Sequence, residues 1–303
     1  MMAIVETYLA TRRAGGFDLL NAGYLLGSFA CFAAKRNETH IRAETAIDWA
    51  ALGPSVAQRD ARLKTVCRFA RYIRAEDGRH ELPPANYFGN RKKRPVPYIY
   101  STTEITRLIE AALGLGPRGT LRAQTYATLI ALLASTGLRI SEVLHLRLAD
   151  ITVDGLLIRN TKFGKTRLVP LHETAAAGLG RYLVHRHQAA PSGDHVFIGR
   201  RGQSLRYQSV QSTFKRLAWK AGLPATRSGR RPRWHGLRHT FAVRALQNSP
   251  TDRDRIGQHM VALATYMGHV NIYATYWYLE ATPELLRDIA DNGETFVCGG
   301  EQS

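Results

Sequence analysis

Cysteine is scarce in this chain of 303 residues. Cys31, Cys67 and Cys298 lie far apart and form no Cys-X-X-Cys pair. A scattered set of odd number excludes a disulfide framework and predicts reduced thiols, as in a cytoplasmic protein. The N-terminal residues also lack a charged segment followed by an apolar core and a small-residue cleavage site. We therefore expect no secretion signal.

Long apolar runs and cofactor motifs are missing too. No uncharged apolar stretch reaches the roughly 18 residues of a membrane-spanning helix, so the sequence predicts no such span. There are no paired carboxylates at metal-site spacing and no Walker-type glycine loop, so we expect neither a metal nor a nucleotide cofactor. Without repeats or low-complexity segments, the chain has the composition of an ordinary globular protein.

Acidic residues are few relative to basic ones. The chain has 42 Lys and Arg against 24 Asp and Glu, which leaves a formal net charge of +18. Such an excess suits a polyanionic partner, either nucleic acid or an acidic membrane surface. Because no basic amphipathic membrane anchor stands out, nucleic acid is the favoured partner.

Residues 1–82 are predicted to form a small helical domain. Apolar residues recur there at helical spacing in two stripes, and the second stripe has a basic opposite face. That face is either simply solvated or in contact with a DNA backbone. The first stripe is Leu25, Phe29 and Phe32, the second is Leu63, Val66, Ala70 and Ile73, and the basic face is Lys64, Arg68 and Arg71.

Residues 83–100 are predicted to be a basic, proline-rich linker. Its prolines stop helices, and the run of charges between them resists burial. The run either lies along a phosphate backbone or serves only as a flexible tether. It consists of Arg91, Lys92, Lys93 and Arg94, and a second domain is expected to follow over residues 101–303.

The second domain begins with a predicted capping box, because Ser101 precedes Glu104 by three residues ahead of an apolar run. A later strong helix is expected from about 121 to 135. Gly137 separates it from a further helix that begins near Arg139. Arg139 is therefore placed at a helix N-terminus, where backbone N–H groups favour an anion.

The pattern changes from helix to strand after residue 150. Asp154-Gly155 between Ile151-Thr152-Val153 and Leu156-Leu157-Ile158 predicts a tight hairpin. A second hairpin over 161–171 places Lys162 and Lys165 at its tip, where lysines either act chemically or only keep the surface soluble. A further short strand is expected at Val196-Phe197-Ile198.

A helix and a cationic loop follow. A helix from Tyr207 should bury its apolar face and leave Lys215 outside, and the next loop carries Arg230 and Arg231. We count these three basic residues among the candidates for DNA contact.

The stretch that starts at His235 is the richest in side chains that could take part in catalysis. If residues 235–239 are helical, His235, Arg238 and His239 share one face while Leu237 packs on the other. The polar face is either a grip for an anion or a decorated surface helix. Further on, Pro283 should end the helix that carries Tyr278, ahead of a final helix that docks on its own domain or on a neighbouring subunit.

Five motifs occur in one order along the chain, and together they resemble the tyrosine recombinase family, also called the phage-integrase or XerC/XerD-like family. The similarity covers the second domain closely and the first only in general shape. Residues 275–285 are similar to a transposase-related subgroup. The motifs are Thr136-Gly137-Leu138-Arg139-Ile140-Ser141-Glu142, the Lys162 hairpin that ends in Leu168-Val169-Pro170-Leu171, His235-Gly236-Leu237-Arg238-His239-Thr240-Phe241-Ala242, Gly268-His269, and Tyr278.

The resemblance implies a mainly α fold with a small antiparallel β-sheet, an α+β arrangement. A helical core-binding, SAM-like domain would precede the catalytic domain. The implied partner is double-stranded DNA, bound by a homotetramer on paired recombination sites, with or without accessory recombination proteins. The implied activity is site-specific integration or excision of a mobile element through a 3′-phosphotyrosyl intermediate, without metal or ATP, in the cytoplasm at the nucleoid.

The resemblance also implies a role for each motif residue. Two arginines would bind the phosphate, since each guanidinium presents a planar fork of donors and stays charged. Two histidines would complete the cradle, a tyrosine would attack, and the hairpin lysine would be the general acid, with Lys165 as second choice. A carboxylate either orients the site or is an ordinary surface group. These residues are Arg139 and Arg238, His235 and His269, Tyr278, Lys162 and Glu142.

Two tyrosines compete with Tyr278, and two other functions compete with recombination. The spacing from His269 favours Tyr278 over Tyr273 and Tyr276. A type IB topoisomerase-like nicking enzyme would use the same residues only to relax DNA. A catalytically silent DNA-binding regulator would keep the fold without the chemistry, and the joint presence of all six catalytic candidates argues against it.

Overall fold

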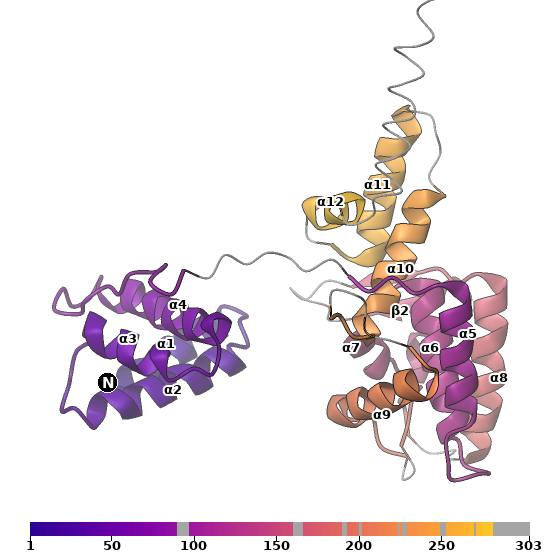
Figure 1. Ribbon diagram of the computed structural model, residues 1–303, viewed down its shortest axis with the longest axis horizontal. Coiled ribbons are helices and arrows are strands. Elements are labelled where there is room, and N and C mark those ends of the chain that lie inside the picture. The colour runs from indigo at the N-terminus through magenta and orange to yellow at the C-terminus, as the bar shows by residue number, and fades with distance from the viewer. Residues whose placement is uncertain are drawn as a thin grey trace, which may run out of the picture. The chain divides into compact units, whose positions relative to one another are not determined.

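Helices make up most of the structure, with one small sheet (Figure 1). This architecture confirms the predicted fold class. The predicted linker charges at 91–94, Lys162 and Lys165, and the final helix expected after Pro283 lie outside the described residues. The computed structural model describes residues 1–89, 97–159, 166–189, 193–199, 202–223, 225, 229–248, 253–269 and 271–280.

The chain divides into two units, Met1–Pro95 and Val96–Ser303. In the first unit, both predicted apolar stripes face one core: Phe29 and all four residues of the second stripe are buried, with Leu25 and Phe32 packed at its edge. Ser55 caps the last helix by accepting a hydrogen bond from the Gln58 N–H. The four helices are α1 (Met2–Ala14), α2 (Leu20–Ala34), α3 (Ala43–Ala51) and α4 (Val56–Ile73).

Four long helices build the body of the second unit. The first has the predicted capping box, since Ser101 accepts from the Glu104 N–H and Glu104 accepts from the Ser101 N–H. Gly137 ends the second in the left-handed conformation, with a φ of 61°, as its position predicted. These helices are α5 (Thr102–Leu113), α6 (Arg122–Thr136), α8 (Glu173–Ala189) and α9 (Tyr207–Lys220).

The sheet has three antiparallel strands in the order β1-β2-β3. Leu156 on β2 pairs with Ile151 on one side and with Val169 on the other, so the two predicted hairpins share their central strand. A short 3-10 helix, η1 (Leu148–Asp150), leads into it. The strands are β1 (Ile151–Thr152), β2 (Gly155–Ile158) and β3 (Arg167–Val169).

The prediction of a strand at Val196-Phe197-Ile198 is wrong. These residues are buried, but within the triplet only Ile198 forms a bridge, an isolated one with Ser204, and a separate bridge pairs His195 with Arg147 just before it. The Val196 N–H bonds to the Leu146 carbonyl and continues no ladder. The triplet is a buried loop instead. The prediction was wrong because the apolar pattern of so short a segment does not distinguish a buried strand from other buried segments.

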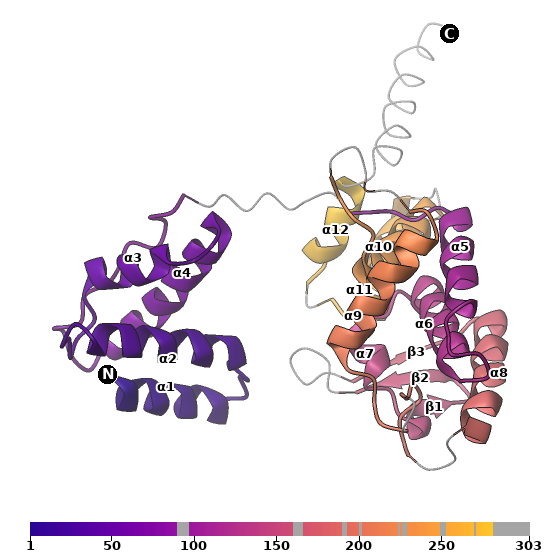
Figure 2. The same cartoon turned by 60° about the horizontal axis from the view of Figure 1, so that its bottom comes forward.

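Four further helices carry the residues singled out by their motifs. In Figures 1 and 2, α11 and α12 lie against α10, and in the view of Figure 1 they lie above the body of the unit. Among the described residues, no helix combines the length and apolar composition needed to cross a membrane. The helices are α7 (Ile140–Leu144), α10 (Trp234–Gln247), α11 (Arg253–Met267) and α12 (Tyr273–Glu280).

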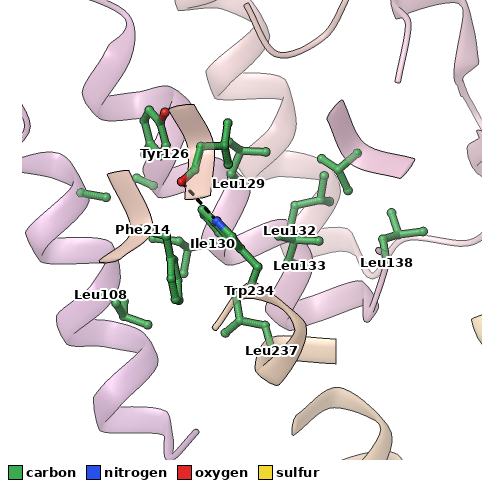
Figure 3. Close-up of a cluster of buried hydrophobic side chains, with 14 of the residues drawn as sticks. Leu108, Tyr126, Leu129, Ile130, Leu132, Leu133, Leu138, Phe214, Trp234 and Leu237 are labelled. Carbon is green, nitrogen blue, oxygen red and sulfur yellow. Dashed lines mark hydrogen bonds between the residues drawn. The ribbon is translucent and has the colours of Figure 1, made fainter. Parts of the chain in front are cut away.

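The core of the second unit holds α10 in place. Figure 3 shows Trp234 of α10 beside Phe214 of α9 and Ile130 of α6, and the Trp234 and Phe214 ring centroids are 4.3 Å apart. The Trp234 indole N–H donates to the Val210 carbonyl at 3.3 Å. Leu237 is fully buried, as its face of the helix predicted. Because one side of α10 is anchored in this core, its other side is free to carry polar groups.

Candidate active site

Arg139 precedes the first residue of α7, where the local sequence places it at a helix N-terminus. Glu142 accepts from the Arg139 backbone N–H at 3.0 Å and from Nη1 at 2.7 Å. The Nη2 of Arg139 reaches the Gly268 carbonyl at 3.3 Å. Glu142 thus contacts Arg139 twice, and the guanidinium keeps a partly exposed edge.

Arg238 lies on α10 and is buried, at 2% exposure. Its Nη1 donates to the Gly137 carbonyl at 2.7 Å and its Nη2 to the Met267 carbonyl at 2.6 Å. Burial, followed by the charge of Arg139, lowers the pKa of Arg238 to about 10. The guanidinium therefore stays positive at neutral pH, and its buried charge would be well matched by an arriving anion.

Arg167 is a site residue that the sequence interpretation missed. It lies on β3, and its side chain is only 11% exposed. Its Nη1 and Nη2 donate to the two oxygens of Glu142 at 3.1 and 2.9 Å. The local sequence carries no signal for it, because Arg167 faces inward with buried Val169 while apolar Leu168 between them is exposed.

Glu142 remains an anion between these two guanidinium groups. Burial would raise its pKa, but the hydrogen bonds from Arg167 and Arg139 outweigh burial, and the pKa of Glu142 lies below its ordinary value. Together the three side chains carry two positive charges and one negative charge at neutral pH.

The first turn of α10 presents His235, and Tyr100 holds that turn. The Tyr100 hydroxyl donates to the Arg233 carbonyl at 2.8 Å, and a Cβ on Gly236 would lie 2.6 Å from the Tyr100 ring. Desolvation, then the charges of Arg238 and Arg139, lower the pKa of His235. Because the residue is exposed on its outer side, solvent weakens the desolvation effect. The direction still favours the neutral ring, which can accept a proton.

His239 lies one helical turn after His235, and its ring contacts both His235 and the aromatic residues of α12. Its ring centroid is 4.4 Å from that of His235, 5.4 Å from that of Tyr278 and 5.0 Å from that of Trp277. The sequence placed His239 on the same face as His235 but assigned it no role. The structure shows it packed between His235 and the tyrosine.

Tyr278 lies inside the site, while the two competing tyrosines point elsewhere. Tyr278 is 3% exposed, against 77% for Tyr273 and 44% for Tyr276. The His269 ring is stacked on Tyr278 with centroids 6.1 Å apart, and its Nδ1 is 2.7 Å from the Thr275 hydroxyl. The structure thus brings this one tyrosine of α12 to the histidines.

The combined arrangement can hold a tetrahedral oxyanion. Guanidinium groups come from α7, β3 and α10, imidazoles from α10 and from the turn after α11, and a phenol from α12. A cavity of about 850 Å³ continues from Arg139 along the sheet, and its lining includes Arg147 and Arg159. Several fixed positive charges beside one phenol form a class of site suited to phosphate esters.

One group of possible metal ligands occurs among the described residues, and it lies in the first unit: His40, Asp77 and His80. The His80 Nδ1 accepts the Ile41 N–H at 3.0 Å, so the proton of a neutral ring is on Nε2 and blocks coordination there. Asp77 is bound by Arg79 at 2.8 Å. These contacts fit a hydrogen-bonded cluster better than a metal centre.

The predicted DNA contacts differ in their surroundings. Lys64 on α4 is paired with the buried carboxylate of Asp60 at 2.9 Å. Among the other described candidates, Arg230 is partly buried. The exposed ones are Arg68 and Arg71 on α4, Lys215 on α9 and Arg231 in the loop before α10.

Comparison with known proteins assigns the chain to a family. Residues 101–284 match the phage integrase family. A Sinorhizobium fredii protein named as an integrase/recombinase, y4rB, is 39% identical over 298 residues, which cover 94% of each chain. Tyrosine recombinase XerD of Caulobacter vibrioides is 31% identical over 248 residues, covering 80% of this chain and 76% of XerD. The chain belongs to the phage integrase family.

Solved structures share the fold. The XerH site-specific recombinase, in a post-cleavage complex with a palindromic difH substrate, superposes with a TM-score of 0.68 at 20% identity, covering 97% of this chain and 85% of XerH. A lambda integrase tetramer on a Holliday junction gives 0.64 at 18% identity, covering 91% and 76%. The Tn1549 transposon integrase, with transposon right end DNA, gives 0.64 at 18%, covering 96% and 98%.

Proposed function

We propose that this protein is a site-specific DNA recombinase that cuts and rejoins DNA through a covalent bond to Tyr278. The observation that carries the proposal is the position of Tyr278, buried beside His239 and His269 and within electrostatic reach of Arg238. A buried tyrosine beside a buried guanidinium is poised to attack a phosphate that the guanidinium binds.

Binding of the phosphate is assigned to Arg139 and Arg238. When the phenol oxygen attacks, the phosphorus becomes five-coordinate and negative charge grows on its non-bridging oxygens. Donors that are already fixed in place stabilise this charge more than they stabilise the ground state. His269, held by Thr275, adds a hydrogen bond to the same oxygens.

Proton transfers accompany the exchange of one phosphoester for another. A free phenol is about one part in a thousand ionised at pH 7, a deficit of roughly 4 kcal/mol. Neutral His235, the proton acceptor that the family resemblance implies, takes the phenol proton as the Tyr278 oxygen bonds to phosphorus, and the His239 ring lies between the two. The bond from phosphorus to the DNA 5′-oxygen breaks, and Lys162 protonates that oxygen. The product is a 3′-phosphotyrosyl bond with a free 5′-hydroxyl, and the reverse steps reseal the DNA.

The substrate and assembly follow from the charge and the relatives. Double-stranded DNA matches the net charge of +18. The helical domain at 1–82 and the linker at 83–100 would hold the duplex, and residues 101–303 would supply the chemistry. Because the lambda integrase structure is a tetramer on a Holliday junction, we assign the chain a homotetramer on paired sites. The likeness to a transposon integrase supports a mobile-element substrate, and a DNA substrate would place the protein at the nucleoid.

The test is a covalent trapping experiment. Nicked duplex fragments from the gene's own neighbourhood are incubated with the protein and resolved in SDS. We expect a denaturation-resistant adduct with wild type and none with Tyr278→Phe, while Tyr276→Phe behaves as wild type. An adduct that survives in Tyr278→Phe contradicts the assignment.

Assays of strand exchange and of DNA relaxation, run beside the trapping experiment, separate the competing functions. Exchange between two paired duplexes supports a recombinase, and relaxation of supercoiled DNA without exchange supports a nicking topoisomerase. Salt-sensitive binding that never becomes covalent in wild type supports a silent regulator.

A further inference from the structure

Glu142 is shared between two arginines in unequal ways. Arg167 holds both carboxylate oxygens with two donors, at 3.1 and 2.9 Å, and its Nε also donates to the Tyr266 carbonyl at 2.9 Å. Arg139 reaches only one oxygen with its side chain, at 2.7 Å. The two-pronged contact with Arg167 therefore fixes the direction of the carboxylate.

The surroundings hold Arg167 in this position. It is only 11% exposed, and Gly268 leaves the space for it, because a Cβ there would lie 2.8 Å from the Arg167 Nη1. Arg139 is more open, at 30% exposure. Of the five guanidinium N–H groups of Arg139, the side-chain contacts to Glu142 and Gly268 use one each on Nη1 and Nη2. Donors remain for a phosphate.

The charge balance of the trio depends on Arg167. With it, two guanidinium groups face one carboxylate and the trio is net positive. Without it, Glu142 and Arg139 form a closed pair that is net neutral. A neutral pair stabilises the growing negative charge of a phosphate transition state far less than a net positive cluster.

We propose that Arg167 is a positioning residue that takes up the charge of Glu142, so that Glu142 orients Arg139 without cancelling its positive charge. This inference rests on the proposed function, in which Arg139 binds the scissile phosphate. It also accounts for the bonds that join β3, the strand that ends the Lys162 hairpin, to Glu142 of α7 and to Tyr266 of α11.

A charge-rescue experiment separates this role from simple packing. Arg167→Met leaves Glu142 alone with Arg139, and the trio loses its net charge. Adding Glu142→Gln removes the uncompensated negative charge and restores the net positive charge. If Arg167 acted only as a structural tie, the second substitution would remove one more hydrogen-bonding group and lower activity further.

The measurement is the single-turnover rate of covalent adduct formation on a nicked duplex at saturating protein. We expect Arg167→Met to slow this rate by about tenfold to a hundredfold, the range for losing a residue that orients a functional group. Arg167→Met with Glu142→Gln should recover at least fivefold of that loss. Arg167→Lys, which keeps the charge but not the fork, should fall between wild type and Arg167→Met.

A matched control uses another buried arginine. Arg186 is 1% exposed, and it donates to the carbonyls of Gly193 and His195, away from Glu142. Arg186→Met should lower the thermal midpoint, and Glu142→Gln should then change the rate by the same factor as in wild type. Should Arg167→Met not fold, Arg167→Gln provides the same loss of charge with a donor retained.

The outcomes are distinct. Arg167→Met and Arg167→Gln at the wild-type rate, or a double variant slower than Arg167→Met, would falsify the inference while the proposed function stands. If wild type itself forms no adduct on its substrate, the proposed function fails first. A rate recovered in the double variant while its thermal midpoint stays low supports the electrostatic role.

Discussion

His235 and Arg238 show how a few ångströms of helix produce two different electrostatic roles. Arg238 is buried and donates to two carbonyls, so it remains a fixed positive charge. His235 lies at the open end of the same helix, and that fixed charge contributes to its lowered pKa. The arginine therefore helps to keep the histidine neutral, which is the state needed to accept the phenol proton.

The pH dependence of cleavage follows from the lowered pKa of His235. Because the pKa of His235 is lowered, its neutral form persists to lower pH than in a free histidine, whose pKa is about 6.5. The single-turnover rate should stay level from neutral pH down to about 6.5 and decline only at more acidic pH. His235→Gln should be slow and lack this acidic decline. A decline that persists in His235→Gln would assign it to another group.

Glycine at one junction decides the geometry between elements. Gly137 ends α6, precedes the N-cap of α7 and gives its carbonyl to Arg238 of α10. A Cβ there would lie 2.4 Å from Phe241 of α10. The end of α6 therefore meets α7 and α10, which carry site residues, where only the smallest residue fits.

Gly137→Ala should accordingly lower stability. A left-handed backbone at a non-glycine residue and an overpacked contact together cost about 2–4 kcal/mol in free energy of unfolding. Chemical denaturation measures it. Gly180→Ala is the matched control, since Gly180 lies in α8 and a Cβ added there would have nothing within 4 Å, so alanine should raise stability by about 0.5–1 kcal/mol. Equal effects at the two positions would contradict the packing argument.

Across the molecule, some basic side chains are already paired with a carboxylate and others are not. Lys64 is paired with buried Asp60, while Arg68 and Arg71 on the same helix are exposed. A cation that is already neutralised releases few counterions when DNA binds. Only part of the 42 Lys and Arg residues is therefore available to a phosphate backbone.

The salt dependence of DNA binding tests this distinction. Each phosphate contact adds about 0.9 to the slope of log affinity against log salt. Replacing Arg68 and Arg71 by alanine should reduce the slope by about 2, and Lys64→Ala should change it little. Arg79→Ala is the control, because Arg79 is paired with Asp77 at 2.8 Å. A slope unchanged in the double variant would remove the α4 face from the DNA interface.

Local sequence determined much of what this chain builds. The capping box at Ser101, the helix stop at Gly137 and the placement of Arg139 before α7 were all predictable. Each depends on hydrogen bonds and backbone angles within a few consecutive residues. The order of the motifs was likewise sufficient to indicate the family.

Only the tertiary structure decided which distant residues meet. The bond from Arg238 to Gly137 spans 101 residues of sequence, and the sharing of Glu142 by Arg167 was not predicted. The buried segment at Val196-Phe197-Ile198 formed no strand, because no neighbouring strand continued its pairing. Among three tyrosines, the packing of α12 alone buried Tyr278. Such contacts depend on how helices pack across the core, which short-range patterns do not record.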